Sequence, residues 1–471
     1  MWWEKQGSMI SQDVIRLILY PFNHMKNCRF RLNGYLIKSG VIKFDIKYKY
    51  KKYVHFDKRV HIEDAKKYIE NPAKVATHSF YPFIHFKNKW IKYSATNGRR
   101  EKPRDLCYAA HMDSYIYQLY AHKLNYAYNS YVKEQGINKC AIAYRDNLGK
   151  SNIEFAKEVL TFARKIGEAY IIVGDFTHFF DELQHEYLKK MICKVLGVDL
   201  LSDDLYAVFK NITKYSIVEL NDLLEYHGGI SYKDFNKKDI ALTSDEFRKF
   251  KTGHLKSNKN KSYGIPQGSP ISSILSNIYM IDFDKALNDF ATTNCGMYRR
   301  YSDDFIIVIP KDSYKDLKSI WGFISTTKNL IPRLILQPDK TQAFSLESLK
   351  LTNVTASVFD NVENGKNVLE YLGFAFDGID ITIRDKTTSK YYYRMYRKVD
   401  NIKKQEVKTK KRIPKYKLYK RYSHLGSHHH GSKNGNFISY IDRCIKVFGK
   451  DEKVGLIKKR HWSKMHKRMA S

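Results

Sequence analysis

The sequence predicts an α+β protein, and three observations carry this prediction. Residues 169–173 and 305–309 are short apolar runs rich in β-branched side chains, which is typical of strands buried on both faces of a sheet. Residues 107–132 and 153–164 instead carry apolar side chains at helical spacing. From residue 384 to residue 421 nearly every third residue is Lys or Arg, with tyrosines between them, which indicates a helical, basic closing region.

The chain is strongly basic. Its 471 residues hold 83 Lys and Arg against 49 Asp and Glu, a formal net charge of +34. This excess favours a polyanionic partner, most often nucleic acid, and the interleaved aromatic rings suit bases beside phosphates. No apolar run is long enough to cross a bilayer and no single amphipathic helix concentrates the charge, so we expect no membrane partner. Codon usage in an AT-rich genome also explains part of the Lys and Tyr excess.

Cysteines and termini carry little chemistry. The six cysteines form no CxxC pair and no Cys/His cluster with zinc spacing, which predicts reduced thiols. The first ten residues lack the apolar stretch of a signal peptide, so a cytoplasmic protein is expected. The three histidines at 428–430 are interpreted as part of a loop.

Composition divides the chain into three parts. Residues 1–100 form an N-terminal extension without a chemical motif, and the polar, breaker-rich segment 95–104 is predicted to join it to the rest. Residues 101–376 form a central unit, in which residues 225–262 are rich in Lys, Asn and Ser and are predicted to be a mobile basic loop. Residues 377–471 form the basic closing region.

Local signals place further elements. Residues 140–145 are predicted to be a short strand, and Ser151 is predicted to cap the helix that follows. Arg145 and Lys150 flank the intervening turn, where they could reach a triphosphate, although solvated surface charge is the commoner explanation. Ser269 is predicted to be a helix N-cap, with Pro270 at the first helical position.

Residues 297–310 are predicted to form two strands joined by a tight turn that carries Asp303 and Asp304. Acidic side chains held at the end of a rigid strand commonly bind a metal ion. The dipeptide alone is weak evidence, because Asp203 and Asp204 form a second such pair that follows a serine and is predicted to start a helix. Neighbouring motifs must therefore decide between the two pairs.

Two such neighbours are present. The strand at 169–176 also brings an acid, Asp175, to its end, where it can be a metal ligand or a helix cap. The segment 264–270 reads Gly-Ile-Pro-Gln-Gly-Ser-Pro, and its two glycines allow the backbone to approach another body closely. The order of Asp175, this segment, the Tyr-Ser-Asp-Asp hairpin at 301–304 and the Tyr-Leu-Gly-Phe strand at 371–374 resembles a reverse transcriptase.

The resemblance covers residues 101–376, and three motifs in order make it specific. Residues 143–153 are further similar to bacterial reverse transcriptases of the abortive-infection, defence-associated group, which are related to retron and group II intron enzymes. Ser302 differs from the commoner Ala of this hairpin, and both side chains are small.

The family implies a right-hand polymerase, with fingers and palm in residues 101–376 and a basic thumb in residues 377–471 that tracks duplex phosphates. It implies an RNA-directed DNA polymerase whose cofactor is a pair of Mg²⁺ ions, with Mn²⁺ as an alternative. The implied partners are an RNA template, the cDNA product and dNTPs, and a homo-oligomer is left open. The similar bacterial enzymes suggest a dedicated noncoding RNA template and a role in antiphage defence.

The resemblance also implies the site residues. Asp175, Asp303 and Asp304 would be catalytic, and with Phe176 they would bind the metal ions, Asp304 being either a ligand or an acid beside the ligands. Phe180 would exclude a ribose 2′-hydroxyl, Arg145 and Lys150 would hold the triphosphate, and Lys340 would protonate pyrophosphate. The implied nucleotide-binding residues are Arg145, Lys150, Phe179, Phe180, Gln267, Gly268 and Lys340. The implied primer grip consists of Tyr371, Leu372, Gly373 and Phe374.

Other interpretations remain open at this point. A retron-like enzyme would usually carry Val-Thr-Gly in the thumb, which this sequence lacks, and the intact acids argue against a maturase-like RNA-binding scaffold without activity. An RNA polymerase would usually have Gly before the acid pair, so Ser302 with Phe180 favours DNA synthesis. Template-independent or protein-primed synthesis is a further alternative, for which no tyrosine can be singled out.

Overall fold

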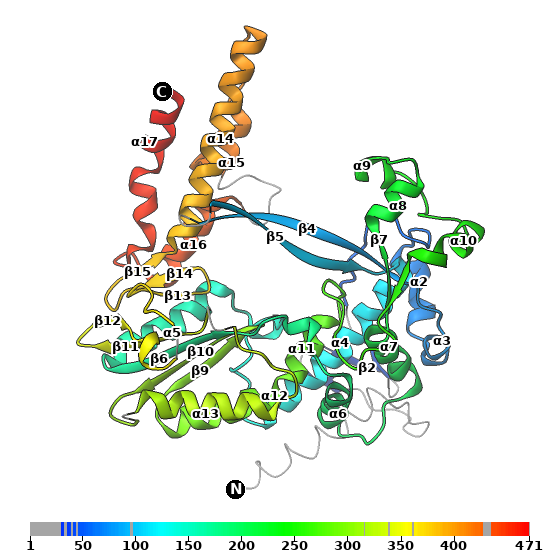
Figure 1. Ribbon diagram of the computed structural model, residues 1–471, viewed down its shortest axis with the longest axis horizontal. Coiled ribbons are helices and arrows are strands. Elements are labelled where there is room, and N and C mark those ends of the chain that lie inside the picture. Colours follow the sequence, from blue (N-terminus) through cyan, green and yellow to red (C-terminus); the bar gives the residue numbers. More distant parts are fainter. Residues whose placement is uncertain are drawn as a thin grey trace.

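A five-stranded sheet lies at the centre of the computed structural model, with strand order β12-β11-β6-β10-β9 (Figure 1). The strands are β6 (Ala169–Asp175), β9 (Met297–Tyr301), β10 (Asp304–Pro310), β11 (Gln342–Glu347) and β12 (Lys350–Asn353). The structure describes residues 30–32, 35–38, 41–43, 46–94, 98–314, 316–337, 340–359, 362–426 and 435–470. The predicted α+β class is confirmed.

Both faces of the central strand β10 are covered, as its apolar run predicts. Phe305, Ile307 and Ile309 point into one core with α12 (Ile281–Thr293) and α13 (Leu317–Leu330). Ile306 and Val308 point into a second core with α5 (Asn152–Ile166) and α16 (Phe437–Phe448). The alternation follows from the two-residue period of a strand, and it makes β10 a rigid base for the turn that precedes it.

Helix α4 (His111–Glu134) runs through the fingers side of the molecule, with α2 (Ile62–Ile69), α3 (Pro72–Ala76), α6 (His185–Leu196), α7 (Asp203–Thr213) and α11 (Ser272–Tyr279) around it. The predicted helix at 107–132 therefore starts later than expected, because residues 107 and 108 still belong to a strand. Helix α7 begins at Asp203, which confirms that this second Asp-Asp pair starts a helix.

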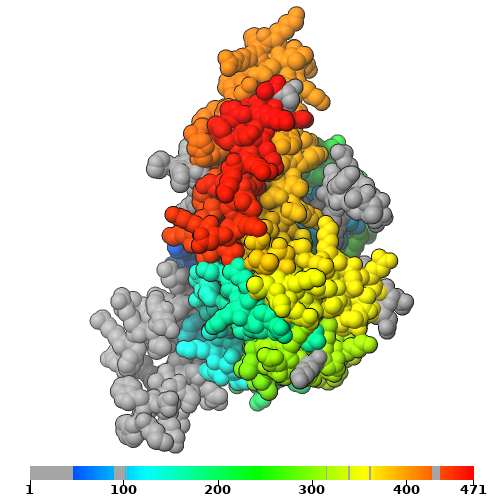
Figure 2. Space-filling model, turned by 90° about the vertical axis from the view of Figure 1, so that its left-hand side faces the viewer, coloured from blue at the N-terminus to red at the C-terminus, as the bar shows by residue number. Residues whose placement is uncertain are grey.

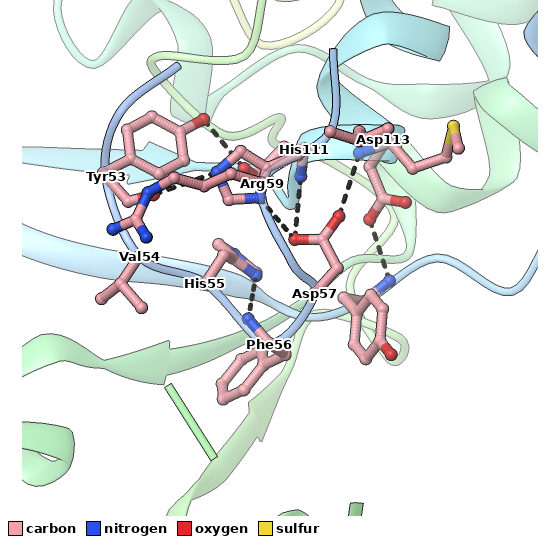
Figure 3. Close-up of polar contacts among 12 residues, drawn as sticks. Tyr53, Val54, His55, Phe56, Asp57, Arg59, His111 and Asp113 are labelled. Atoms are coloured by element: carbon pink, nitrogen blue, oxygen red, sulfur yellow. Dashed lines mark hydrogen bonds and ion pairs between the residues drawn. The ribbon is translucent and has the colours of Figure 1, made fainter. Parts of the chain in front are cut away.

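A side chain from far along the chain caps the start of α4. The Asp57 carboxylate accepts hydrogen bonds from the backbone N–H groups of His111 and Met112, each at 3.0 Å, and from the His111 ring at 2.7 Å (Figure 3). Burial alone would raise the pKa of Asp57, but these bonds hold it below its usual range. The segment around Asp57 is thus an integral part of the fold around α4.

The predicted boundary near residue 100 is wrong. Strands β4 (Phe83–Ser94) and β5 (Gly98–Tyr108) form one long antiparallel hairpin, paired from Ile84 with Tyr108 to Ser94 with Gly98. Residues 98–104 of the polar segment interpreted as a linker belong to strand β5, and residues 95–97 lie outside the described part. The hairpin extends from the β7 side of the molecule toward α14 and α15 (Figure 1).

The basic segment 225–262 is folded rather than a mobile loop. It contains the end of α8 (Leu220–Tyr226), then α9 (Tyr232–Phe235), α10 (Ser244–His254) and β8 (Leu255–Ser257), and β8 pairs with β7 (Ser216–Glu219) beside β4. Phe235 and Phe250 are buried in a core with Val54 and Ile84. A few apolar side chains at the correct positions outweigh a polar average composition, because a partner surface far away in sequence buries them.

The closing region is helical and basic, as predicted. A small sheet of β13 (Leu369–Tyr371), β14 (Phe374–Phe376) and β15 (Ile381–Ile383) leads into α14 (Asp385–Thr409), followed by α15 (Tyr416–Tyr422), α16 and α17 (Leu456–Ala470). Helices α14 and α17 pack side by side in a column above the sheet (Figures 1 and 2). Met395, Val399, Leu418 and Met465 form the column's core.

The remaining features are the first three strands, the cysteines and the lengths of the helices. Short strands β1 (Phe30–Leu32), β2 (Tyr35–Lys38) and β3 (Val41–Lys43) form a separate three-stranded sheet. The five described cysteines are free thiols, while Cys28 and the histidines at 428–430 lie outside the described residues. No helix among the described residues has the length and apolar character needed to cross a bilayer.

Candidate active site

The register between β6 and β10 brings the predicted acids together. Asp304 is paired directly opposite Asp175, because the apolar runs of the two strands align along their whole length. Asp303 occupies the turn just before β10, and its backbone carbonyl accepts a hydrogen bond of 3.1 Å from the N–H of Phe176. Three carboxylates from two distant parts of the sequence thus lie together where β6 ends and β10 begins.

The turn between β9 and β10 has only two residues, Ser302 and Asp303. The prediction that this turn carries both acids is wrong for Asp304, which is the first residue of β10. Ser302 adopts a positive φ of 61°, which a non-glycine residue rarely does and which the surroundings must enforce. The Ser302 hydroxyl lies 3.2 Å from the Tyr144 hydroxyl, and the Ser302 carbonyl accepts a 2.8 Å hydrogen bond from Arg300. Both the side chain and the backbone carbonyl of Ser302 are therefore fixed by neighbouring residues.

A fully buried ion pair supports this turn from below. Arg300 donates to both oxygens of Asp284, at 2.7 and 2.6 Å, and their side chains are 0% and 1% exposed. Tyr298 donates a third hydrogen bond to Asp284 at 2.8 Å. Burial alone would lower the pKa of Arg300, but the Asp284 carboxylate keeps that pKa above its ordinary value. Arg300 is thus a fixed strut between α12 and the catalytic turn.

The pKa values of Asp303 and Asp304 are both raised above their ordinary range. Burial and the nearby Asp175 carboxylate raise the pKa of Asp303. Asp304 keeps an exposed surface, yet the protein around its carboxyl withdraws it from bulk water. Together with a hydrogen bond to Asp175 and repulsion from Asp303, this raises the pKa of Asp304 to about 8. A cation would relieve this repulsion.

Lys340 currently supplies part of that positive charge. Its ammonium donates to Asp175 at 2.6 Å, and the Asp175 carbonyl accepts a 2.8 Å hydrogen bond from the Gln337 N–H. Among the described residues, no three His, Cys, Asp or Glu side chains already surround a common point as metal ligands. The oxygen donors nevertheless fit Mg²⁺, which prefers carboxylates and water. Asp175, Asp303 and Asp304 could hold it if Lys340 shifted away.

The Gly-Ile-Pro-Gln-Gly segment lies against the turn that follows β6. The Ile265 N–H donates to the Phe180 carbonyl at 2.9 Å, and the Gln267 carbonyl accepts from the Cys107 N–H at 2.7 Å. Gly268 has φ +110°, and a Cβ there would lie 2.3 Å from the Cys107 carbonyl oxygen, so only glycine fits. The close approach expected of Gly268 is therefore made to strand β5 of the same chain.

The structure places the two phenylalanines of this turn differently. Phe180 is half-buried, and its predicted role in excluding a ribose 2′-hydroxyl stays a prediction. Phe179 is 4% exposed and stacks on Phe176 in the core, so its ring is not available to a nucleotide. The predicted helix start at Ser269 is also wrong, since α11 begins at Ser272 after a backbone turn. The role of Phe176 as a ligand through its backbone carbonyl stays a prediction.

Arg145 does not fit its predicted role in holding a triphosphate. It is 4% exposed, donates to Asn129 at 2.9 Å and to the Ala141 carbonyl at 3.2 Å, and also bonds to Asn138. Residues 140–145 form only a single bridge, from Ala141 to Arg300, rather than a strand. Arg145 therefore organises this segment instead of facing solvent. Lys150 is exposed and pairs with Glu158 at 3.0 Å, and its role stays a prediction.

The expected primer grip is a hairpin. Strands β13 and β14 are joined by Leu372 and Gly373, both with positive φ, the geometry of a type I′ turn. Tyr371 and Phe374 flank this turn and point into the core beneath it. The Gly373 carbonyl accepts from the Arg384 N–H at 3.1 Å, which ties the turn to the start of α14. Tyr371 and Phe374 are thus buried, and the role of the turn in a primer grip stays a prediction.

Two functional features were missed in the sequence. The Arg300–Asp284 pair has no local signal, because its members lie on different elements and only their complete burial reveals them. The β4–β5 hairpin carries exposed cations such as Lys87 and Arg104, and its alternating pattern was masked by polar, turn-forming residues. The hairpin reaches toward α14 (Figure 1).

Three carboxylates gathered at the ends of adjacent strands, beside a basic helical region, form the kind of site that polynucleotide polymerases use to hold two metal ions. The family described as reverse transcriptase (RNA-dependent DNA polymerase) matches residues 127–376, which is more than half of the chain. The chain therefore belongs to the reverse transcriptase family. It has the right-hand polymerase fold.

Solved structures similar to the chain include fungal telomerases. Apo telomerase from Candida tropicalis truncated from its C-terminal domain shares 14% identity at a TM-score of 0.40, over 68% of this chain and 59% of that one. Telomerases in complex with a TWJ fragment of telomeric RNA share 15% identity. The Candida tropicalis complex has a TM-score of 0.38 over 86% and 64% of the two chains, and the Candida albicans complex 0.36 over 87% and 64%. The chain thus spans less than two thirds of each structure. No curated protein sequence matches it.

Proposed function

We propose that this reverse transcriptase adds dNTPs to a primer at Asp175 and Asp303, with Asp304 beside them, by two-metal catalysis. The observation that carries the proposal is the antiparallel register that sets Asp304 opposite Asp175. When bound, two Mg²⁺ ions would stabilise the attacking and leaving oxygens of an in-line displacement. The chain's own carboxylates, which repel one another without a cation, would be the ligands.

Lys340 has two roles in this proposal. Without metal its ammonium neutralises Asp175, to which it donates at 2.6 Å. With the site loaded it would be released toward the nucleotide, where an ammonium group can donate a proton to departing pyrophosphate. Phe180, half-buried beside the Ile265 backbone, would contact the sugar and reject a 2′-hydroxyl.

The test compares two acids of the same type. Asp303→Asn should abolish incorporation of labelled dTTP on an RNA template, while Asp203→Asn should leave it unchanged. Asp203 is the matched control because it belongs to the other Asp-Asp pair, is exposed and lies at the start of α7. Equal activity of the two variants would contradict the proposal.

We further propose that the template is a dedicated noncoding RNA and that the enzyme acts in bacterial antiphage defence. The support is the similarity of residues 143–153 to the defence-associated group. Nucleic acid co-purified with the wild type should contain cDNA of one defined sequence, which the Asp303→Asn preparation should lack. Phage should form fewer plaques on a lawn of bacteria that express the wild type than on a lawn that expresses Asp303→Asn. The same cDNA in both preparations would overturn the polymerase assignment, and equal plaque counts would overturn the defence role alone.

A further inference from the structure

A cavity of about 770 Å³ lies at the base of the thumb. Its walls are the first turns of α14, helix α15 and the start of α16, and we call it the thumb pocket. Its volume lies in the range of roughly 300–1,000 Å³ that is typical of small-ligand sites. The pocket could therefore enclose a ligand the size of one nucleotide.

The walls of the thumb pocket are strongly cationic. Lys386, Lys390 and Arg394 follow one another at four-residue spacing, so they share one face of α14. Lys417 and Lys420 line it from α15. None of the described residues that line the pocket is acidic. Like charges at this spacing repel one another, and an anion in the pocket would relieve that repulsion.

The floor of the pocket is aromatic. Tyr391, Tyr422 and Phe437 line it, but Tyr391 and Tyr422 are only 9% and 5% exposed. Phe437 is half-buried and its ring centroid lies 4.4 Å from that of Tyr391, so it is the ring that a base can contact. At one end, the Nε of Arg384 is buried without a hydrogen-bond partner in the described structure. A second guanidinium nitrogen of Arg384 lies 3.4 Å from Glu370. Lysine and arginine side chains beside an aromatic ring suit a nucleotide, because the cations can bind its phosphate and the ring can contact its base.

We propose that the thumb pocket binds a nucleoside-phosphate unit held outside a duplex, supplied either by an unpaired segment of RNA or by a free nucleotide. A duplex presents its phosphates on the outside of a wide rod, which would lie across the mouth of the pocket rather than enter it. An unpaired nucleotide can place its phosphate against the walls and its base on the floor. The proposal rests on the proposed function only in taking RNA as one source.

The test uses full-length chains in an Asp303→Asn background, so that no probe is consumed. A pocket variant combines Lys386→Gln, Arg394→Gln and Lys417→Gln. A matched control combines Lys398→Gln, Lys404→Gln and Lys408→Gln, which removes the same charge from exposed positions of α14 outside the pocket. Equal thermal midpoints would show that both are folded. The probes are a short unstructured RNA, a blunt RNA–DNA duplex and a fluorescent ATP analogue, each followed by fluorescence anisotropy.

The pocket variant should bind the unstructured RNA about tenfold more weakly than the control does. In a plot of the logarithm of RNA affinity against the logarithm of salt concentration, the slope should become shallower by roughly 0.7 for each phosphate that the pocket variant no longer neutralises. The affinity for the duplex should be the same in both variants. This result assigns RNA as the source, whereas selectively weaker binding of the ATP analogue assigns a free nucleotide. Equal affinity of both variants for RNA and nucleotide would overturn the proposal, as would a parallel weakening of duplex and single-strand binding. Because binding is measured without turnover, these outcomes do not depend on whether the wild type polymerises DNA.

Discussion

Replacing Asp284 by Asn should destabilise the palm far more than an ordinary loss of one surface charge. The change keeps the shape of the side chain but leaves the Arg300 guanidinium, 0% exposed, without its counter-charge. Breaking one partner of a buried pair costs about 3–5 kcal/mol. For a cooperative unit of about 150–250 residues, this corresponds to a thermal midpoint lower by roughly 6–20 °C.

The same substitution should also reduce catalysis below the unfolding temperature. Arg300 donates to the Ser302 carbonyl at 2.8 Å, and without Asp284 it is no longer held in that position. Displacement of a catalytic turn by about 1 Å can lower turnover roughly 100-fold. Thermal unfolding followed by circular dichroism, together with dTTP incorporation on an RNA template, measures both effects.

Helix α12 supplies a matched control for this prediction. Asp289 forms an exposed pair with Lys285 at 3.1 Å on the same helix, and such pairs contribute about 0.3–0.5 kcal/mol. Asp289→Asn should therefore leave both the thermal midpoint and the turnover nearly unchanged. If Asp284→Asn shifted the midpoint no further than Asp289→Asn does, the reasoning about the buried strut would be refuted.

Three further predictions follow from the site and the fingers. Phe180→Ala should admit ribonucleotides, measured as the ratio of rNTP to dNTP incorporation, and an unchanged ratio would count against a sugar contact. Because the pKa of Asp304 is raised to about 8, protons should compete with Mg²⁺, so the half-saturating Mg²⁺ concentration should rise as pH falls from 9 to 7; a pH-independent value would argue against this acid as a ligand. Burial lowers the pKa of His55 from 6.5 to about 3. Between pH 6.5 and about 3 the unfolded chain therefore binds one more proton than the folded chain does. The free energy of unfolding should decrease by up to about 1.4 kcal/mol for each unit by which the pH is lowered in this range. Chemical denaturation of His55→Gln should show a flatter pH dependence, and equal slopes would contradict the assignment.

Local patterns in the sequence were sufficient for several elements. The apolar run from Phe305 to Ile309 predicted strand β10 and a hairpin before it correctly, because strand period is a property of neighbouring residues. The turn itself consists of Ser302 and Asp303, so only one of the two acids predicted for it lies there. The capping box of Ser151 with Glu154 likewise confirmed the start of α5. The basic thumb helices followed from composition and spacing alone.

Predictions failed where burial depends on residues far apart in sequence. The segment 225–262 looked like a loop because its average composition is polar, yet Phe235 and Phe250 pack against Val54 from the N-terminal part of the chain. No window of neighbouring residues contains that information.

The sequence by itself determined the chemistry available to this protein: three acids at the ends of strands, a glycine-rich segment before a helix, and a large excess of positive charge. The tertiary structure alone decided how these groups act together. It set Asp304 opposite Asp175 and placed the Arg300–Asp284 strut under Ser302. The physical reason is that motif residues depend on local backbone preferences, whereas strand register and buried charge pairing depend on the whole core.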